Sequence, residues 1–342
     1  MERKQRGILA HAQRATATPV PRILFIKTSS LGDVVHNCPA VSDVARRVPG
    51  AVIDWVVEEP FAEVAAMHAA VRRVIPVAVR QWRSHLLAPA TWSGFAAFRA
   101  ALRAEDYDAV IDSQGLIKSA LIAAVARGRR HGLDRASARE ALAARFYDVV
   151  HAVPSGLHAV ERNRRLAAAA LGYGADGDGD YGLRVAGDAP AVAGLRPSDR
   201  YALLLTMTSR DDKLWPEESW RALGAWLEQR GQRSLLAWGT EEERRRCLRI
   251  ASAMEGAVVL RRMSLVELAR LARGAQCVVG VDTGLAHLAA ALDVPVVGLY
   301  GGSDPALTGL HGNGRVRNLG NAGGRPAVSE VQAALDELKD QR

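Results

Sequence analysis

Cysteines and long apolar runs are both scarce in this chain of 342 residues. The three cysteines, Cys38, Cys247 and Cys277, lie far apart without CxxC spacing, which argues against a disulfide framework or a zinc site and fits a reducing cytoplasm. No stretch approaches the roughly eighteen apolar residues that indicate a transmembrane helix, so we expect any membrane contact to be peripheral. The basic residues 1–20 hold only a short apolar run and are interpreted as a flexible extension, not a secretory signal.

Acidic residues are outnumbered by basic ones. Lys and Arg total 45 against 37 Asp plus Glu, which gives a formal net charge of +8, and only five of the cations are Lys. Such an excess suits nucleic acid, an anionic membrane surface or phosphorylated substrates, or reflects a bias in composition. Because the Arg residues are scattered and no basic helix is interleaved with aromatic residues, we expect no nucleic-acid partner.

Two common nucleotide-binding motifs are also absent. No GxGxxG follows the first apolar strand, and none of the five Lys residues follows a glycine. The chain therefore lacks both the dinucleotide fingerprint and the P-loop. These absences disfavour a dehydrogenase and a nucleoside triphosphatase.

What is present is a repeated alternation of apolar strands and amphipathic helices. In the first half we expect extended segments at 22–27, 51–57, 71–79 and 107–112, and helices at 33–48, 61–69, 98–105 and 117–126. The second half repeats the pattern, with strands at 201–206, 234–238, 257–260, 277–281 and 294–300, and helices that begin near Pro216, Ser264, Leu285 and Ser329. The alternation predicts an α/β fold of two Rossmann-like, doubly wound domains that face each other across a cleft.

A stretch rich in Gly, Asp and Pro separates the two halves. We therefore expect a flexible extension over 1–20, an N-terminal domain over 21–170, a linker over 171–199, a C-terminal domain over 200–325 and a terminal helix over 326–342.

Two strand-to-helix junctions carry the clearest chemical signal. They are Lys-Thr-Ser-Ser-Leu-Gly-Asp at 27–33 and Val-Asp-Thr-Gly-Leu-Ala-His at 281–287. Free backbone N–H groups at a helix N-terminus favour an anion, and open α/β sheets bind ligands beyond the carboxyl ends of their strands. In the second junction Asp282, Thr283 and Gly284 suit a diphosphate, although an ordinary N-cap has the same residues. His287 either donates to a phosphate or makes a core contact.

A second cluster follows the first strand of the C-terminal domain, at 206–213. Its hydroxyls, including those of Thr208 and Ser209, and the ammonium group of Lys213 belong to the same rim as Asp282. A point cation beside a helix N-terminus suits a diphosphate leaving group, whose charge grows as the bond breaks. The alternative is a solvated loop whose charges pair with one another.

Candidate residues for binding the acceptor substrate lie at the first junction and elsewhere in the predicted N-terminal domain. Asp33 opens its helix, where it either stabilises the helix or takes a proton from an acceptor hydroxyl. Further candidates for orienting that base or for holding an anionic acceptor are Lys27, Ser30, Gln114, Lys118, Arg72, Arg80 and Arg83. The Arg residues are equally compatible with a solvated basic edge.

At these residues the chain resembles the lipopolysaccharide heptosyltransferases of glycosyltransferase family 9, more closely those of type I than those of type II. The similarity extends from about Arg22 to Gly309 in unbroken order and rests on the segments 27–36, 54–59, 108–116, 210–213 and 281–287. It implies a GT-B fold with the donor held by the C-terminal domain. The implied reaction is inverting transfer of L-glycero-D-manno-heptose from ADP-heptose to the first Kdo of Kdo2-lipid A, at the cytoplasmic face of the inner membrane.

The resemblance also implies roles for individual residues. Asp33 is the expected base, Asp282 binds heptose hydroxyls, Glu243 binds the ribose and Met263 packs on adenine. The diphosphate is held by Thr208, Ser209, Lys213, Thr283, Gly284 and His287. Because Lys213 and a helix terminus neutralise ADP, we expect no metal and no other cofactor.

Three other interpretations remain open from the sequence. The first is heptosyltransferase II or another ADP-sugar transferase, which shares the donor chemistry and differs in acceptor. The second is a non-catalytic nucleotide-sugar binding module in which Asp33 only stabilises a helix. An epimerase or dehydrogenase of the same fold class is the third, and the missing glycine fingerprint disfavours it.

Overall fold

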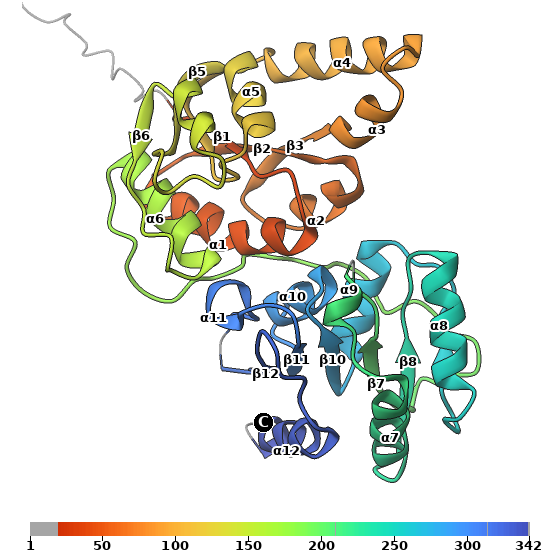
Figure 1. The fold of residues 1–342 in the computed structure, drawn as a ribbon. Coiled ribbons are helices and arrows are strands. Elements are labelled where there is room, and N and C mark those ends of the chain that lie inside the picture. The colour runs from red at the N-terminus through yellow and green to blue at the C-terminus, as the bar shows by residue number, and fades with distance from the viewer. Residues whose placement is uncertain (1–19, 209, 313, 341–342) are drawn as a thin grey trace, which may run out of the picture.

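The computed structural model describes residues 20–208, 210–312 and 314–340. They form two α/β domains stacked one above the other, with the N-terminal domain uppermost in Figure 1. Each domain contains one six-stranded sheet whose strand pairs are all parallel. This arrangement confirms the predicted α/β class with two doubly wound domains.

The N-terminal sheet has the strand order β3-β2-β1-β4-β5-β6. Its strands are β1 (Arg22–Ile26), β2 (Val52–Glu58), β3 (Val71–Val77), β4 (Asp106–Asp112), β5 (Arg127–Leu133) and β6 (Val149–His151). The helices of this domain are α1 (Leu31–Arg47), η1 (Glu59–Phe61), α2 (Ala62–Ala66), α3 (Val79–Ser84), α4 (Pro89–Leu102), α5 (Ile117–Val125), η2 (Ala141–Phe146) and α6 (Ala159–Leu171). One apolar core lies between the sheet and α1, α2 and α6, and a second between the sheet and α4 and α5.

The C-terminal sheet has the order β12-β11-β10-β7-β8-β9. Its strands are β7 (Arg200–Leu205), β8 (Gln232–Leu236), β9 (Val258–Val259), β10 (Cys277–Val281), β11 (Val296–Tyr300) and β12 (Val316–Gly320). Its helices are η3 (Asp211–Lys213), α7 (Glu217–Glu228), α8 (Glu241–Ala251), α9 (Leu265–Gly274), α10 (Gly284–Ala291), α11 (Pro305–Thr308) and α12 (Val328–Asp340). The helices α7, α8 and α12 cover one face of the sheet, and α9 and α10 cover the other.

The connection between the domains runs from the end of α6 at Leu171 to the start of β7 at Arg200. Tyr181 and Val185 of this segment pack into the core beneath α1, whereas Val192 packs into the C-terminal core. The predicted extension at 1–20 lies almost wholly outside the described residues.

Several elements have no counterpart among the predicted ones. They are β5, β6, β12, α3, α6, α8, α11, η2 and η3, and α4 begins nine residues before the predicted start of its helix. The sequence of β5 is Arg-Gly-Arg-Arg-His-Gly-Leu, which lacks the apolar alternation of a strand. It forms a strand because β4 on one side and β6 on the other supply its hydrogen-bond partners.

Candidate active site

The two predicted junctions meet at the boundary between the domains. Helix α1 lies directly above α10 in Figure 1, and the first turns of the two helices are in contact. A Cβ atom placed on Gly284 would lie 2.5 Å from Cβ of Leu31, and one on Gly32 would lie 3.1 Å from Cδ2 of His287. Both glycines therefore permit the helices to approach. The two domains face each other as predicted, and at this point of their boundary they are in contact.

Asp33 lies at the first turn of α1 and accepts hydrogen bonds from two directions. Its Oδ2 atom accepts from the backbone N–H of Ser30 at 3.0 Å, and its Oδ1 atom accepts from Nη2 of Arg139 at 2.6 Å. Burial raises the pKa of Asp33, but the charges of Lys27 and Arg139 outweigh burial and leave the pKa below its usual value. The side chain is therefore ionised at neutral pH.

Lys27, at the end of β1, is buried beneath Asp33. Its ammonium group donates to the Ser113 carbonyl at 2.8 Å and to Oδ1 of Asn163 at 3.3 Å. Burial lowers its pKa to about 8, although Asp33 opposes that shift. Lys27 thus fixes a positive charge behind the carboxylate, and α6 contributes Asn163 to its support.

A polar rim surrounds the carboxyl ends of β1, β2 and β4. Oε1 of Gln114 accepts from the backbone N–H groups of Thr28 and Ser29, and Nζ of Lys118 donates to Oγ of Ser29 at 3.2 Å. Nε2 of Gln114, Oγ1 of Thr28 and Oε1 of Glu58 are buried and have no partner among the described residues. Burial raises the pKa of Glu58. The rim therefore has free donor and acceptor capacity for a polar ligand.

Asp282 is the centre of the second half of the site. Its Oδ2 atom accepts from Nζ of Lys213 and from Oγ of Ser303, each at 2.6 Å, and its Oδ1 atom lies 3.6 Å from Nε2 of His287. Burial raises the pKa of Asp282, but contacts with His287, Lys213 and Ser303 outweigh burial and leave the pKa well below its usual value. The backbone carbonyl of Asp282 accepts from Oγ1 of Thr208 at 2.8 Å.

The N-terminus of α10 is not capped by its own N-cap side chain. Thr283 occupies the N-cap position with extended backbone angles and makes no side-chain cap hydrogen bond. The first backbone N–H groups of α10 therefore remain available, beside Lys213 and the hydroxyl of Thr208. This combination of helix dipole, cation and hydroxyl suits a phosphorylated ligand.

A pair of histidines connects the two halves. Nε2 of His36 on α1 lies 3.2 Å from Nδ1 of His287 on α10, and the other ring nitrogen of His287 faces Asp282. Burial and the neighbouring His287 hold the pKa of His36 well below its usual range. His36 therefore stays neutral at neutral pH. An N–H···N hydrogen bond can then join the uncharged His36 ring to His287.

The remaining residues that were predicted to bind the sugar donor are less closely grouped. Glu243 lies at the first turn of α8, where its Oε2 atom accepts from the backbone N–H groups of Gly239 and Thr240 at 2.6 and 3.1 Å. Met263 lies just before α9 and packs against the C-terminal core. Ser209 lies outside the described residues. The assignments of Glu243, Met263 and Ser209 stay predictions.

The three arginines of the predicted acceptor set do not lie together. Arg80 and Arg83 are exposed on α3, beyond the carboxyl end of β3. Arg72 is placed elsewhere: it donates to both carboxylate oxygens of Asp54 at 2.9 and 2.7 Å, and it pairs with Glu105 near the amino end of β4. Because these contacts use its guanidinium group away from the rim, Arg72 does not belong with the other acceptor candidates.

Comparison with known proteins places this geometry in a family. A sequence profile of glycosyltransferase family 9 (heptosyltransferase) matches residues 95–335, which is more than half of the chain. The chain belongs to glycosyltransferase family 9. It is therefore a glycosyltransferase, as the sequence predicted.

Individual relatives agree with the profile. The chain is 47% identical over 299 residues to lipopolysaccharide heptosyltransferase 1 of Escherichia coli strain K12, a match that covers 86% of this chain and 92% of the relative. It is similar in structure to the E. coli heptosyltransferase WaaC with ADP, with a TM-score of 0.85, 44% identity, and coverage of 93% of this chain and 99% of WaaC. WaaC with ADP-2-deoxy-2-fluoro heptose gives a TM-score of 0.80 and 42% identity, over 92% and 99% of the two chains.

Two contacts of this family 9 site come from residues that the sequence analysis did not single out. Arg139 follows β5 in a loop, 106 residues from its partner Asp33. Ser303 follows β11 in a glycine-rich turn and donates to Asp282. Ser303 could have been found, because β11 is adjacent to β10 and its carboxyl end must face the same rim.

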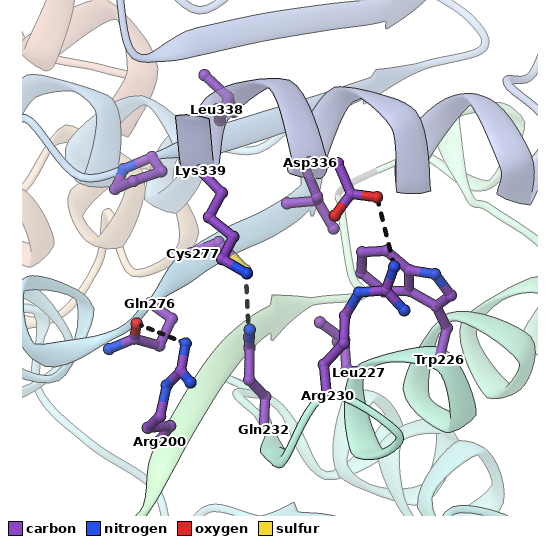
Figure 2. Close-up of a pocket in the computed structure, with 12 residues that line it drawn as sticks. Arg200, Trp226, Leu227, Arg230, Gln232, Gln276, Cys277, Asp336, Leu338 and Lys339 are labelled. Atoms are coloured by element: carbon purple, nitrogen blue, oxygen red, sulfur yellow. Dashed lines mark hydrogen bonds and ion pairs between the residues drawn. The ribbon is translucent and has the colours of Figure 1, made fainter. Parts of the chain in front are cut away.

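A separate cavity of about 290 Å³ lies at the opposite end of the C-terminal sheet of this glycosyltransferase. Figure 2 shows it between α7 and α12, with Arg200 and Gln232 at the start of their strands and Trp226, Arg230 and Lys339 along its walls. Asp282 lies at the other end of β10, so this cavity is not part of the site.

Within residues 20–208, 210–312 and 314–340, no group of three or more His, Cys, Asp and Glu side chains has the arrangement of a metal site. The same residues contain no helix of the length and apolar character that crossing a membrane requires.

Proposed function

We propose that this protein transfers L-glycero-D-manno-heptose from ADP-heptose to the first Kdo sugar of Kdo2-lipid A, with inversion at the anomeric carbon. The observation that carries the proposal is the contact between α1 and α10. It brings Gly32, next to Asp33, against His287, which faces Asp282. A candidate base and a candidate diphosphate site are thus adjacent, on opposite domains.

In the proposed donor complex, the C-terminal domain holds ADP-heptose. The uncapped N-terminus of α10, Lys213 and the Thr208 hydroxyl bind the diphosphate, with His287 and Ser209 completing the set. Asp282 accepts hydrogen bonds from heptose hydroxyls, Glu243 from the ribose hydroxyls, and Met263 packs on the adenine. The likeness to WaaC, which was solved with ADP and with a fluorinated ADP-heptose, supports this donor.

The proposed chemical step begins at Asp33. Its carboxylate takes the proton of an acceptor hydroxyl, and the acceptor oxygen attacks the anomeric carbon from the face opposite to ADP. The bond between that carbon and the phosphate oxygen breaks, and ADP leaves with its added negative charge facing Lys213 and the α10 amides. The lowered pKa of Asp33 supports this role, because its carboxylate is ionised at neutral pH and can accept the proton.

The acceptor is proposed to meet the polar rim of the N-terminal domain. Kdo carries a carboxylate, for which Lys118 and Lys27 supply positive charge, and its hydroxyls match the unpartnered amide of Gln114. Ser30 orients the base through its backbone N–H group. Arg80 and Arg83 lie farther out, where anionic groups of a lipid would approach.

The proposed location is the cytoplasmic face of the inner membrane, where a lipid-linked acceptor is found. No metal or other cofactor is part of the proposed step, since Lys213 and the helix N-terminus supply positive charge to the leaving group.

The decisive experiment supplies purified protein with ADP-heptose and either Kdo2-lipid A or the same lipid already carrying one heptose. We expect mass spectrometry to show one added heptose on Kdo2-lipid A only, and NMR to show inversion at the anomeric carbon. Turnover of the heptosylated lipid alone would indicate a heptosyltransferase II activity, and absence of transfer to either would refute the proposal.

A further inference from the structure

An arm projects from the N-terminal domain, and its tip is apolar. The arm consists of residues 79–102, namely α3, α4 and the turn between them, at the upper right of Figure 1 and directed away from the C-terminal domain. Four of the ten exposed large apolar side chains among the described residues lie within it: Leu86 (59% exposed), Leu87 (98%), Trp92 (63%) and Phe95 (40%). Such a concentration of exposed apolar side chains marks an interaction surface.

Hydrogen bonds within the tip satisfy several of its polar groups. Oγ1 of Thr91 donates to the His85 carbonyl at 2.7 Å, Nε1 of Trp92 donates to the Leu86 carbonyl at 3.0 Å, and the backbone N–H of Ala88 donates to the His85 carbonyl at 3.0 Å. These bonds fix the turn with Leu86 and Leu87 exposed. A turn that satisfies part of its own backbone can enter an apolar phase at lower cost.

Charge complements the apolar tip. The 24 residues of the arm include Arg80, Arg83 and Arg99 and contain no Asp or Glu. Along α4, Phe95 and Arg99 are four residues apart and share a face, so the guanidinium group lies one turn behind the apolar ring. Apolar residues in front of cations match the boundary between acyl chains and anionic headgroups.

The apolar surface continues behind the tip. A cavity of about 610 Å³ lies between β3, α3 and α4 and is lined by apolar residues that include Val77, Trp82, Ala97 and Phe98. His85 and Ala88 of the turn and Thr91 in the first turn of α4 line the same cavity, so it opens beside the tip. An acyl chain of the surrounding lipid has room to enter it.

The base of the arm adjoins the polar rim of the site. Glu58 lies at the end of β2. Its pKa is influenced both by the charge of Lys118 on the rim and by that of Arg80 at the start of the arm, so both cations lie near it. The backbone N–H of Glu58 donates to the Thr28 carbonyl at 3.0 Å. A membrane held by the arm therefore lies beside the site rather than behind it.

We propose that the arm docks on an anionic lipid bilayer, with Leu86, Leu87, Trp92 and Phe95 in the acyl-headgroup boundary and Arg83 and Arg99 at the phosphates. The inference rests on the proposed function, since a lipid-linked acceptor gives the docking its purpose. Docking presents the rim to the membrane surface and leaves the C-terminal domain in the aqueous phase.

Sedimentation of the full chain with vesicles tests this proposal. With phosphatidylethanolamine and phosphatidylglycerol vesicles, we expect Leu87→Asp to weaken partitioning by about tenfold or more, because it replaces insertion by charge repulsion. Leu248→Asp, at a 43% exposed position on α8, is the matched control and should bind as the wild type does. Arg99→Gln should weaken binding by about fivefold on these vesicles and leave binding to neutral phosphatidylcholine vesicles unchanged.

Fluorescence quenching gives a second, independent measurement. Trp92 is the exposed tryptophan of the described residues, and Trp82 lines the cavity beside the tip, so lipids brominated on their acyl chains should quench the protein on binding. Trp92→Phe should reduce that quenching to the part that comes from Trp82, while vesicle binding persists. Equal vesicle binding by Leu87→Asp and wild type would overturn the proposal. So would a change from dimer to monomer in Leu87→Asp, which would assign the tip to a second copy of the chain.

A soluble acceptor separates this inference from the proposed function. On a Kdo acceptor without acyl chains, Leu87→Asp should transfer heptose at the wild-type rate, whereas on vesicle-embedded Kdo2-lipid A its rate should fall by about tenfold. Inactivity of the wild type on both acceptors would refute the proposed function. Equal rates of Leu87→Asp and wild type on the embedded lipid would refute only the docking role.

Discussion

His36 of α1 and His287 of α10 face each other across the domain boundary, with 3.2 Å between Nε2 of the first and Nδ1 of the second. Their ring centroids are 4.5 Å apart, and the ring of His158 lies 5.3 Å from His36 on its other side. His311 of the C-terminal domain stacks on His158 at 5.2 Å. The two rings of the N-terminal domain, His36 and His158, thus lie between His287 and His311 of the C-terminal domain, and protonation of these rings would charge the interface.

Lowering the pH should therefore reduce the free energy of unfolding, and this loss should begin before the carboxylates titrate. Burial lowers the pKa of His158 to about 4 and holds that of His36 well below its usual range, whereas a histidine in the unfolded chain has a pKa of about 6.5. Between about pH 6.5 and 4 the unfolded chain binds protons that the folded chain does not, so the free energy of unfolding should fall as the pH is lowered. Urea denaturation across this range measures the slope.

The variant His36→Gln tests which residues cause that slope. Glutamine retains a hydrogen-bonding group opposite His287 and does not titrate, so the free energy of unfolding should depend less steeply on pH. His85→Gln, on the exposed turn of the arm, is the control and should retain the wild-type slope. An unchanged slope in His36→Gln would assign the pH dependence to groups outside the interface.

Replacement of Asp33 should separate catalysis from binding. Asp33→Asn keeps an oxygen that can accept the Ser30 N–H but cannot take a proton, so kcat should fall by about 10²–10⁴ with little change in donor affinity. The control is Glu267→Gln, because Glu267 accepts the same kind of capping hydrogen bond at the first turn of α9. A fall in kcat of only a few-fold in Asp33→Asn would exclude the general-base role.

Arg139 should set the acid limb of the pH profile. Its guanidinium group and Lys27 together lower the pKa of Asp33, so Arg139→Gln should raise that pKa. Because the base acts in its ionised form, the acid limb of kcat/KM should move to higher pH, with the plateau at alkaline pH less affected. A limb at the same pH in both proteins would show that the ion pair has no influence on the reacting group.

Lys213 should contribute to donor affinity. Lys213→Ala removes the cation beside the α10 N-terminus and leaves Asp282 without its ammonium partner. Since a hydrogen bond to a charged group contributes about 1.5–3 kcal/mol, the Kd for ADP-heptose should rise by about 10- to 100-fold. Calorimetry measures the change, and Lys339→Ala at the remote cavity of Figure 2 should bind normally. Equal affinities of Lys213→Ala and wild type would contradict the diphosphate assignment.

The parts of the site that sequence predicts are those fixed by local chain geometry. Asp33, Thr283 and Gly284 each lie at a strand-to-helix junction, and the rule that ligands meet the carboxyl ends of parallel strands places both junctions on functional rims. Lys213 and Thr208 follow a neighbouring strand and were found for the same reason. Their proximity in the structure follows from strand order, which the alternating pattern already indicates.

The parts that sequence misses depend on long-range packing. Arg139 reaches Asp33 only because β5 joins the sheet, and the charged, glycine-containing sequence of β5 gives no strand signal. Arg72 was assigned to the acceptor on charge alone, yet Asp54 binds it bidentately near the opposite end of the sheet. Charge type is visible in a sequence, whereas the partner of each charge depends on the fold.

Gly284 shows how a residue can fit two explanations, and its substitution distinguishes them. The sequence suggests a glycine that admits a phosphate, but in the structure a Cβ at this position would meet Cβ of Leu31 at 2.5 Å. Gly284→Ala should therefore destabilise the protein by about 1–3 kcal/mol even without ligand, as measured by urea denaturation. Gly156→Ala is the control, because no atom lies within 4 Å of the added methyl group.

The double variant Leu31→Ala with Gly284→Ala tests the cause of that destabilisation. Shortening Leu31 removes most of the atoms that crowd position 284, although its own Cβ remains. The two changes should then be non-additive, with a coupling free energy of about 0.5–3 kcal/mol that favours the double variant. Additive effects would mean that the helices do not pack through these residues in solution. In that case a loss of ADP-heptose affinity in Gly284→Ala would point to the diphosphate as the reason for the glycine, and the closely packed α1–α10 boundary would have to open in solution.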